Sequence, residues 1–414
     1  MAVFKSFKAV RPLPETAEKI AALPYDVMNS EEAREMVQGN ALSFLHVDKA
    51  EIDLEKSVNP YDEKVYLKAR ENLDALEKNG FCKQDEKACF YIYRQIMDKR
   101  AQTGLVGCAG IDDYINGVIK KHEFTRADKE QDRINHVDYC NANTGPIFLT
   151  YRENDFINKT VSDWQSAHAP VYDFEKNGVQ NTVWVIDCEE TNAKLADAFS
   201  KIDSLYIADG HHRCASAVKV GLKRREQFPA FDGSEEFNFF LAVAFPKNEL
   251  AIMDYNRVIK DLNGLSTDEF FKKLSEKFTV EEYSKEGAYR PEKRHSFGMY
   301  LDKKWYILEA KEGTFDESDP VLRLDVSILQ NNCIDPIFSI TDPRTDKRID
   351  FVGGIRGLAE LERRCALDMR IAFSMFPTSL DELMDIADAG KVMPPKSTWF
   401  EPKLLSGLFI HKLS

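Results

Sequence analysis

The chain of 414 residues is longer than a single hydrophobic core usually supports, so we expect two domains. Its hydrophobic content of 43% is ordinary for a globular protein, and the sequence shows neither repeats nor low-complexity segments. The formal net charge of −13 argues against a general nucleic-acid binder, because phosphate backbones bind to basic surfaces. A local basic cluster can still bind a small nucleotide, since net charge says little about one pocket.

The N-terminal residues and the cysteines favour a location in the cytoplasm. The stretch Met1–Lys5 lacks the long apolar core of a signal peptide, and no run of about twenty apolar residues predicts a membrane span. The cysteines are scattered without a C-x-x-C pair, which argues against a structural zinc site and a thioredoxin-like motif. Cys89 and Cys108 lie in apolar runs and are expected to be buried free thiols in a reduced cytoplasm.

Hydrophobic patterning predicts strands and helices in irregular succession over the first part of the chain. Strands are expected near Phe4–Val10, Ala88–Tyr93, Gly104–Tyr114, Asn181–Ile186, Ser204–Ala208 and Asn238–Phe245. Helices are expected at Ser30–Val37, Lys64–Lys78, Thr191–Phe199 and Cys214–Gly221. Because strands and helices do not alternate strictly, the pattern favours an α+β fold.

The pattern changes after Leu262, which predicts a smaller second α+β domain. Its expected elements are a helix at Phe270–Phe278, a hairpin of Ser296–Leu301 and Trp305–Glu309, a helix at Val321–Cys333, a strand at Arg348–Val352, a helix at Gly357–Leu367, a strand at Arg370–Phe376 and a helix at Ser379–Ala387. We therefore expect domains at 1–262 and 263–414, the second ending in a C-terminal tail that returns to the functional site of the first.

The most informative segment is a strand-to-helix turn. The apolar run Leu205–Ala208 stops at Asp209 and Gly210, and His211, His212 and Arg213 follow at once. The start of a helix presents free backbone N–H groups and a partial positive charge to the space in front of it. With the added cations the turn is a candidate phosphate-binding site, and the alternative is an ordinary tight turn with solvated side chains.

Two further polar segments carry candidate acid–base groups. Asp26 follows the rigid bend at Pro24, and an ordinary turn before a capped helix is the alternative. The charged stretch of residues 120–133 contains His122, Glu123 and Thr125, which would supply an acid–base pair and a phosphate ligand. Such charge density is also typical of a solvated helix face.

Two loops complete the candidate set. Residues 142–148 form a polar loop that leads into an apolar strand. Near the C-terminus, two prolines precede Lys396, Ser397 and Thr398 and would hold a cation and two hydroxyls at little entropic cost. A tail docked on the core is the alternative for this segment.

Several common signatures are absent from the sequence. There is no G-x-x-x-x-G-K-[ST] phosphate loop and no set of protein-kinase motifs, and Gly104, Gly107 and Gly110 have the wrong spacing for a dinucleotide fingerprint. A metal site at Asp209, His211 and His212 is disfavoured because adjacent histidines diverge on regular structure. No metal ligands are assigned.

The whole chain resembles a bacterial family long catalogued only as a domain of unknown function and now often described as SerK-like, after the free-serine kinases. The motifs that carry the resemblance occur in the same order: Pro24-Tyr25-Asp26-Val27, Ser43-Phe44-Leu45-His46-Val47, His122-Glu123-x-Thr125 with Asp132-Arg133, Asp209-Gly210-His211-His212-Arg213 and Met393-Pro394-Pro395-Lys396-Ser397-Thr398.

The Asp209–Arg213 stretch also resembles the phosphate-binding turn of the ParB/sulfiredoxin superfamily, which implies a nucleotide-binding core of that type in residues 1–262. Sulfiredoxins have a reactive cysteine where this chain has His211, so sulfiredoxin chemistry is disfavoured. Partition proteins carry a helix-turn-helix for DNA, and this acidic chain shows no basic recognition helix. Small-molecule phosphoryl transfer is therefore the leading enzymatic interpretation that the resemblance implies.

The resemblance implies a kinase that transfers phosphate from ATP or ADP to a hydroxyl of a small metabolite, with free L-serine as the first candidate and Mg²⁺ implied by the chemistry. Asp209, Glu123 and Asp26 are candidates for the general base and stay unranked. The phosphate-binding candidates are Gly210, His211, His212, Arg213, Thr125, Arg133, Lys396, Ser397 and Thr398. A non-catalytic nucleotide-binding regulator and an interaction scaffold remain alternatives. We expect no nucleic-acid or membrane partner and leave a homodimer open.

Overall fold

The structure, a computed structural model, describes residues 2–414 and divides into two compact units. Unit 1 extends to Leu250 and also includes Pro402–Ser414, and unit 2 is Ala251–Glu401. The expected boundary at residue 262 therefore needs correction. It falls after β14 (Tyr255–Ile259), whose backbone pairs with two strands of unit 2 and so belongs to that unit.

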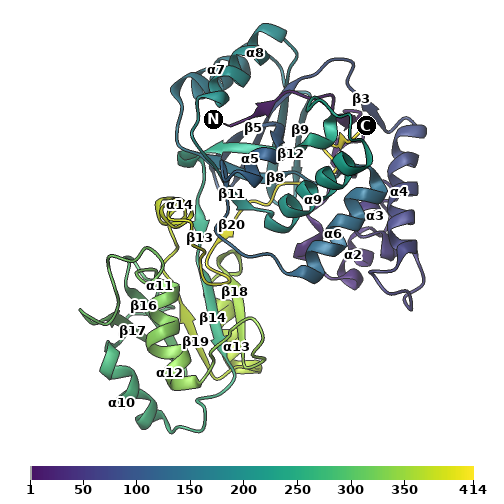
Figure 1. Cartoon of the computed structure of the whole chain (residues 1–414). Helices are drawn as coiled ribbons and strands as arrows, with labels where there is room; N and C mark the ends of the chain where they lie inside the picture. Colours follow the sequence, from purple (N-terminus) through teal and green to yellow (C-terminus); the bar gives the residue numbers. More distant parts are fainter. Residues whose placement is uncertain (1) are drawn as a thin grey trace. The chain divides into compact units, whose positions relative to one another are not determined.

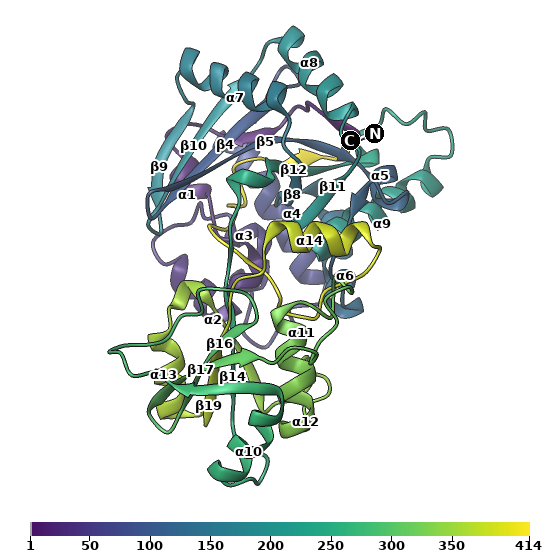
Figure 2. The ribbon, with the colours of Figure 1, turned by 90° about the vertical axis from the view of Figure 1, so that its left-hand side faces the viewer.

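Unit 1 is built on one mixed sheet of nine strands, with the order β6-β11-β8-β12-β5-β4-β10-β9 and with β1 beside β5. Figure 2 shows β9, β10, β4 and β5 as successive neighbours. The strands are β1 (Phe4–Lys5), β4 (Phe90–Met97), β5 (Arg100–Gly110), β6 (Ile119–Lys120), β8 (Ile147–Tyr151), β9 (Tyr172–Lys176), β10 (Val179–Ile186), β11 (Leu205–Asp209) and β12 (Phe239–Pro246).

The pairing within this sheet confirms the expected α+β class. Strand β8 is parallel to β12, and β11 is parallel to β6, whereas the other pairs are antiparallel. A regular βαβ succession would give a parallel sheet, so the mixed pattern agrees with the irregular order of elements in the sequence.

The helices of unit 1 bury apolar residues against this sheet and against one another. They are α1 (Ala17–Ile20), α2 (Ser30–Met36), α3 (Leu45–Asp48), α4 (Glu63–Lys78), α5 (Ile111–Ile115), α6 (Ala127–Cys140), α7 (Asp155–Ala167), α8 (Glu189–Ser200) and α9 (His211–Gln227), with short 3₁₀ turns at Tyr25–Val27, Ala50–Asp53, Glu236–Asn238 and Lys247–Glu249. Phe199 of α8 and Val218 of α9 belong to the core that also contains Ile207 and Ala242 of the sheet. Figure 1 shows α4, α6 and α9 next to one another, and Ser216 on α9 donates a hydrogen bond to the Glu130 carbonyl on α6.

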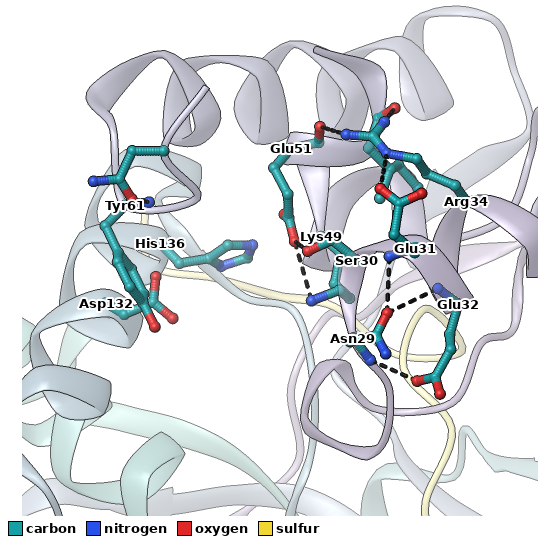
Figure 3. A network of polar contacts seen from close by, with 12 residues as sticks. Asn29, Ser30, Glu31, Glu32, Arg34, Lys49, Glu51, Tyr61, Asp132 and His136 are labelled. Atoms are coloured by element: carbon teal, nitrogen blue, oxygen red, sulfur yellow. Dashed lines mark hydrogen bonds and ion pairs between the residues drawn. The ribbon is translucent and has the colours of Figure 1, made fainter. Parts of the chain in front are cut away.

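A second core lies under the N-terminal helices and includes Phe44, Leu73 and Ile410. Helix α2 begins with a capping box, in which Asn29 accepts from the Glu32 amide and the Glu32 carboxylate accepts from the Asn29 amide. Figure 3 shows these contacts at the start of α2. The box fixes the backbone that directly follows the 3₁₀ turn Tyr25–Val27.

The last residues of the chain, 402–414, are held in unit 1 by backbone pairing. Strand β21 (His411–Lys412) pairs with β7 (Ala142–Asn143), and Val10 and Ala22 form bridges with Ile410 and Ser406. A further small sheet joins β2 (Val10–Pro12) to β3 (Cys82–Gln84). The tail is thus an integral part of the unit that contains the Asp209 turn.

Unit 2 is an antiparallel sheet with the order β15-β17-β16-β19-β14-β18 and with helices on both faces. Its strands are β14, β15 (Phe278–Glu282), β16 (Ser296–Leu301), β17 (Lys304–Ala310), β18 (Ile349–Gly353) and β19 (Ile371–Ser374), with β13 (Ile252–Met253) and β20 (Trp399–Phe400) forming a separate pair. Its helices are α10 (Thr267–Lys277), α11 (Asp325–Leu329), α12 (Asp335–Phe338), α13 (Ala359–Leu367) and α14 (Leu380–Asp388), with a π-helical segment at Gln330–Ile334 and a 3₁₀ turn at Gly354–Arg356. Figures 1 and 2 both show α12 and α13 on opposite sides of this sheet.

Several expected elements differ in extent from the observed ones. The strand expected at Gly104–Tyr114 ends at Gly110, where α5 begins, and the strand expected at Phe4–Val10 is interrupted between β1 and β2. The cysteines are free thiols, with Cys89 and Cys108 buried as expected. No helix within residues 2–414 has the length and apolar character that crossing a membrane requires.

Candidate functional site

The candidate site is built around the turn from β11 to α9. Strand β11 is apolar and buried up to Ala208, so the chain reaches the surface of the core at Asp209. Gly210 has a φ of 92°, a conformation that favours glycine, and it is the N-cap of α9 without any side-chain capping bond. A Cβ at Gly210 would lie 3.1 Å from Nε of Arg213, so the glycine also leaves room for that guanidinium.

Asp209 is held by two donors. Oδ1 accepts from the Gly210 amide at 2.7 Å, and Oδ2 accepts from Nζ of Lys403 at 2.9 Å. Burial alone would raise the pKa of Asp209, but Lys403 and Arg213 lower it below its ordinary value. The carboxylate is therefore ionised at neutral pH and is a weak base, because efficient general bases have a pKa near the working pH.

His211 lies edge-on to His122, with 4.5 Å between the ring centres. Burial lowers the pKa of His122 to about 4 and that of His211 well below its usual range, so both rings are neutral at pH 7. Neither ring nitrogen of His122 has a hydrogen-bond partner of good geometry among residues 2–414. Nδ1 of His211 is 3.9 Å from a carboxylate oxygen of Glu123, whose side chain is 45% exposed.

His212 and Asp26 approach one another from different parts of the chain. Nε2 of His212 accepts a hydrogen bond from the Arg126 amide at 2.9 Å, which ties the first turn of α9 to the loop before α6. Burial lowers the pKa of His212, and the nearby Asp26 carboxylate partly opposes that effect. Asp26 lies exposed on the 3₁₀ turn Tyr25–Val27 and is near enough to His212 to act on its pKa.

Arg213 lines a small hollow beside the turn. The hollow is lined by Tyr25, Asp48, Arg133, His136, Val137, Asn143, Thr144, Gly145, Ile147, Arg213 and Ser406. Its volume of about 20 Å³ is room for one water molecule or one oxygen of an anion. Nη1 of Arg213 donates a hydrogen bond to the Pro146 carbonyl at 2.6 Å, and Gly145 accommodates the guanidinium without a side chain of its own.

Arg133 forms a second cationic wall of the hollow. Its guanidinium is paired with Asp132 at 2.9 Å and lies 4.0 Å from the centre of the Tyr25 ring. Burial acts to lower the pKa of Arg133, but Asp132 and Tyr25 raise it overall. For Tyr25 burial has the opposite effect and raises the pKa to about 12, so the phenol stays neutral beside the cation.

An acidic and a neutral group complete the lining of the hollow. Asp48 accepts a hydrogen bond from the Thr144 hydroxyl at 2.8 Å and lies 3.9 Å from Nε2 of His136. Burial and then Arg133 lower the pKa of His136, whose Nε2 also lies 3.1 Å from the Val47 carbonyl. Figure 3 shows His136 and Asp132 on the same helix, α6.

The remaining predicted site residues are spread over both units. Thr125 donates to Glu130 at 2.5 Å and so belongs to the loop that precedes α6 in unit 1. Lys396, Ser397 and Thr398 belong to unit 2. There Lys396 has a φ of 60°, and the Ser397 hydroxyl donates to the Pro394 carbonyl at 2.6 Å, which makes the segment a tight internal turn.

Three residues of the candidate site were not predicted from the sequence. Lys403 is a tail residue distant in sequence from Asp209, and no local pattern signals their pairing. Asp48 directly follows the Ser43–Val47 motif, so the position of that motif could have indicated it. His136 lies on α6 one helical turn after Asp132-Arg133, a spacing that places it on the same face as these residues.

The candidate site offers few carboxylates that could bind a divalent cation. No group of three His, Cys, Asp or Glu side chains suited to a metal ion occurs among residues 2–414. Mg²⁺ in nucleotide sites typically takes one or two carboxylates, and phosphates and waters complete its shell. The exposed carboxylates at the edge of the site, Glu123 and Asp26, fit that limited role.

Comparison with known proteins finds similar solved structures and one matching family. None of the curated proteins matches it. A free serine kinase in complex with AMP is 14% identical, with 74% of this chain and 89% of that chain covered and a TM-score of 0.36. A conserved hypothetical protein from Pyrococcus furiosus is 14% identical, with coverage of 76% and 97% and a TM-score of 0.34.

A third structure is SbnI with a C-terminal truncation from Staphylococcus aureus, at 12% identity, coverage of 73% and 85% and a TM-score of 0.37. The model of the family described as "Protein of unknown function (DUF1015)" matches residues 4–327. That match covers more than half of the sequence and ends within unit 2, so the chain belongs to this family.

Proposed function

We propose that unit 1 binds a nucleotide through its phosphate groups at the β11–α9 turn. The observation that carries the proposal is the position of Arg213, on the first turn of α9 and in the wall of a hollow shared with Arg133. Uncapped amides at the start of a helix and a guanidinium beside them are suited to phosphate oxygens. The proposal agrees with the resemblance of this turn to the ParB/sulfiredoxin superfamily.

The hydrogen bonding of Arg213 leaves capacity for an anion. Among residues 2–414, its guanidinium donates one hydrogen bond, to Pro146, whereas a guanidinium has five N–H donors. Arg133 is already engaged by Asp132 and by the Tyr25 ring. Arg213 is therefore the principal phosphate ligand of the proposal, and Arg133 supports the charge of the hollow.

The reaction we propose is transfer of phosphate from ATP or ADP to a hydroxyl of a small metabolite, with L-serine as the first candidate acceptor. Mg²⁺ bound with the nucleotide would neutralise part of its phosphate charge. Asp209 holds Lys403 and Gly210 in place and is too weak a base for the acceptor hydroxyl. Glu123 and Asp26 therefore remain as candidates for the general base.

The alternative is a nucleotide-binding regulatory protein without turnover. The observation that favours it is the double engagement of Asp209, since both carboxylate oxygens at the turn already accept a hydrogen bond from the chain itself. Both functions use the same phosphate-binding turn and differ only in whether product forms.

Calorimetric titration of the full chain with AMP, ADP, ATP and CTP tests nucleotide binding. Arg213→Gln should weaken binding at least about tenfold, the equivalent of one charge-assisted hydrogen bond. Arg224→Gln is the matched control, because Arg224 lies on the same helix and pairs with Asp138 away from the hollow. Equal affinity in the two variants, or no binding by the parent protein, would contradict the proposal.

A coupled assay with serine, homoserine and threonine against ADP and ATP tests catalysis. Glu123→Gln and Asp26→Asn should separate the two candidate bases, because only loss of the true base lowers kcat while nucleotide affinity is kept. Nucleotide binding without product from any donor and acceptor pair would favour the regulatory alternative.

A further inference from the structure

Unit 2 contains a cavity of about 290 Å³ whose lining residues all belong to that unit. This volume is close to the lower limit for pockets that hold small organic ligands. Arg257 on β14 forms one wall, and Gln330 of the π-helical segment, Phe351 of β18 and the pair Pro394 and Pro395 form others. Single π-helical turns within helices are frequent at functional sites.

Strand alternation directs Arg257 into this cavity. Its neighbour Val258 packs in the core with Leu361 of α13, so Arg257 points to the opposite face of the sheet. That face carries Val326 and Gln330, which line the same cavity. Arg257 is only 4% exposed, although it is a charged residue in a strand paired on both sides.

The contacts of Arg257 do not neutralise its charge. The guanidinium donates to the carbonyl of Tyr255 and, at 3.1 Å, to that of Lys396, and it lies 5.4 Å from the centre of the Phe351 ring. No ion pair joins Arg257 to any carboxylate within residues 2–414. Burial lowers the pKa of Arg257 to about 10, which still leaves it cationic at neutral pH.

An unpaired cation in such surroundings is costly, because burial removes its hydration without supplying a counter-ion. The other charged residues of the lining, Asp342 and Arg344, neutralise each other at 2.9 Å. The cavity therefore has one uncompensated positive charge beside an aromatic ring and two prolines. A monoanion with a flat apolar body matches both features, and a planar carboxylate matches the guanidinium fork.

We propose that the unit 2 cavity is a binding site for a small monocarboxylate whose carboxylate pairs with Arg257 and whose apolar body contacts Phe351 and the two prolines. The site is distinct in its residues from the phosphate-binding turn and does not depend on the function proposed for that turn.

The test uses the full chain and three probes that share a phenyl ring. Benzoate supplies the carboxylate, benzamide is its neutral counterpart, and phenyl phosphate supplies a phosphate instead. Saturation-transfer NMR and calorimetry should show benzoate binding at least about tenfold tighter than benzamide and tighter than phenyl phosphate. This comparison needs only the parent protein, so it stands even where a variant does not fold.

Arg257→Met removes the charge and keeps much of the side-chain volume, and it should weaken benzoate binding at least about tenfold. Its thermal midpoint should equal or exceed that of the parent, because an unpaired buried charge is replaced by an apolar group. Arg363→Met on α13 is the control, since Arg363 is exposed and paired with Glu360, and it should leave benzoate binding unchanged.

Equal binding of benzoate and benzamide, or no binding of either, would overturn the proposal. Preference for phenyl phosphate would overturn the carboxylate assignment in favour of a phosphate. Unchanged benzoate affinity in Arg257→Met would show that the guanidinium does not contact the probe.

Discussion

Nζ of Lys403 lies 2.9 Å from Oδ2 of Asp209, although the two residues are 194 positions apart in the sequence. Arg213 is the other cation that acts on this carboxylate. The tail of the chain therefore supplies one of the groups that keep the Asp209 carboxylate ionised. Asp209 has the role of an ionised anchor for Lys403 and the Gly210 amide.

Lys403→Met should lower the free energy of unfolding at pH 7 by about 2 kcal/mol, the usual size of a charge-assisted hydrogen bond. Because the pKa of Asp209 is lowered in the folded chain, the pair stabilises the protein above the ordinary aspartate pKa of 3.8 and loses that effect as the pH falls. The difference between parent and variant in urea midpoints should therefore shrink toward pH 3. Lys412→Met is the control on the same tail, where the more exposed pair with Glu77 should contribute less than about 1 kcal/mol.

The neutral His122 ring should make the protein less stable as the pH falls. The unfolded chain takes up a proton near the ordinary pKa of 6.5, whereas the folded chain does so only near 4. Between these values the unfolded state binds more protons, so stability decreases toward low pH by up to about 3 kcal/mol. His122→Gln should flatten urea midpoints measured between pH 7 and pH 4.

His46 provides the control of opposite sign for the His122 measurement. The hydrogen bond to Asp53 raises the pKa of His46, so its contribution is present at low pH and is lost as the pH rises. His46→Gln should steepen the acid loss of stability that His122→Gln flattens. The same slope in both variants would contradict the assignment of a neutral buried ring to His122.

Gly210→Ala should disturb both stability and nucleotide affinity. A positive φ at a residue with a Cβ costs about 1 kcal/mol, and the added methyl would also press on the Arg213 guanidinium. Gly117→Ala is the matched control, because Gly117 has a φ of 75° and open space around the added carbon. Urea unfolding should show a loss in both variants that is larger in Gly210→Ala, and calorimetry should show weaker nucleotide binding only in Gly210→Ala.

Asn29→Ala removes the N-cap of α2, which follows the turn that carries Tyr25 and Asp26. Loss of the cap should lower the free energy of unfolding by about 1 kcal/mol. It should also loosen that turn and so weaken nucleotide binding. Asn154→Ala removes the N-cap of α7, a helix that contributes no residue to the hollow, and should cost a similar amount. A fall in nucleotide affinity for Asn154→Ala as large as that for Asn29→Ala would show that the Asn29 effect is not local.

Many strands and helices could be predicted because apolar spacing and capping residues lie within the elements that they define. The apolar run before Asp209 predicted β11, and the helix expected at Phe270–Phe278 is α10, which begins at Thr267 after a capping box at Ser266. Where apolar residues continued without a break, the limits were wrong. The helix expected from Val321 starts only at Asp325 and continues as a π-helical segment from Gln330, which apolar periodicity alone does not distinguish.

The local geometry of the candidate site could be predicted in part for the same reason. The end of the strand, the glycine, the two histidines and the arginine at 209–213 are adjacent in sequence, and so their turn could be inferred. Asp26, Glu123 and Asp209 could not be ranked because a carboxylate's basicity depends on its neighbours in space. Burial and the ion pair with Lys403 distinguish Asp209, and neither can be known before the chain is folded.

The sequence by itself determined the α+β class, the helix-starting turn at Gly210 and the positive charge of Arg213 beside it. These follow from residue types and spacings within a few positions of one another. The tertiary structure alone decided that Lys403 pairs with Asp209 and that Arg133 and Arg213 line one hollow. It also decided that Arg257 lies buried with no carboxylate paired to it among residues 2–414. Electrostatic energies depend on the distance between charges and on their burial. For residues far apart in sequence, folding alone sets that distance and that burial.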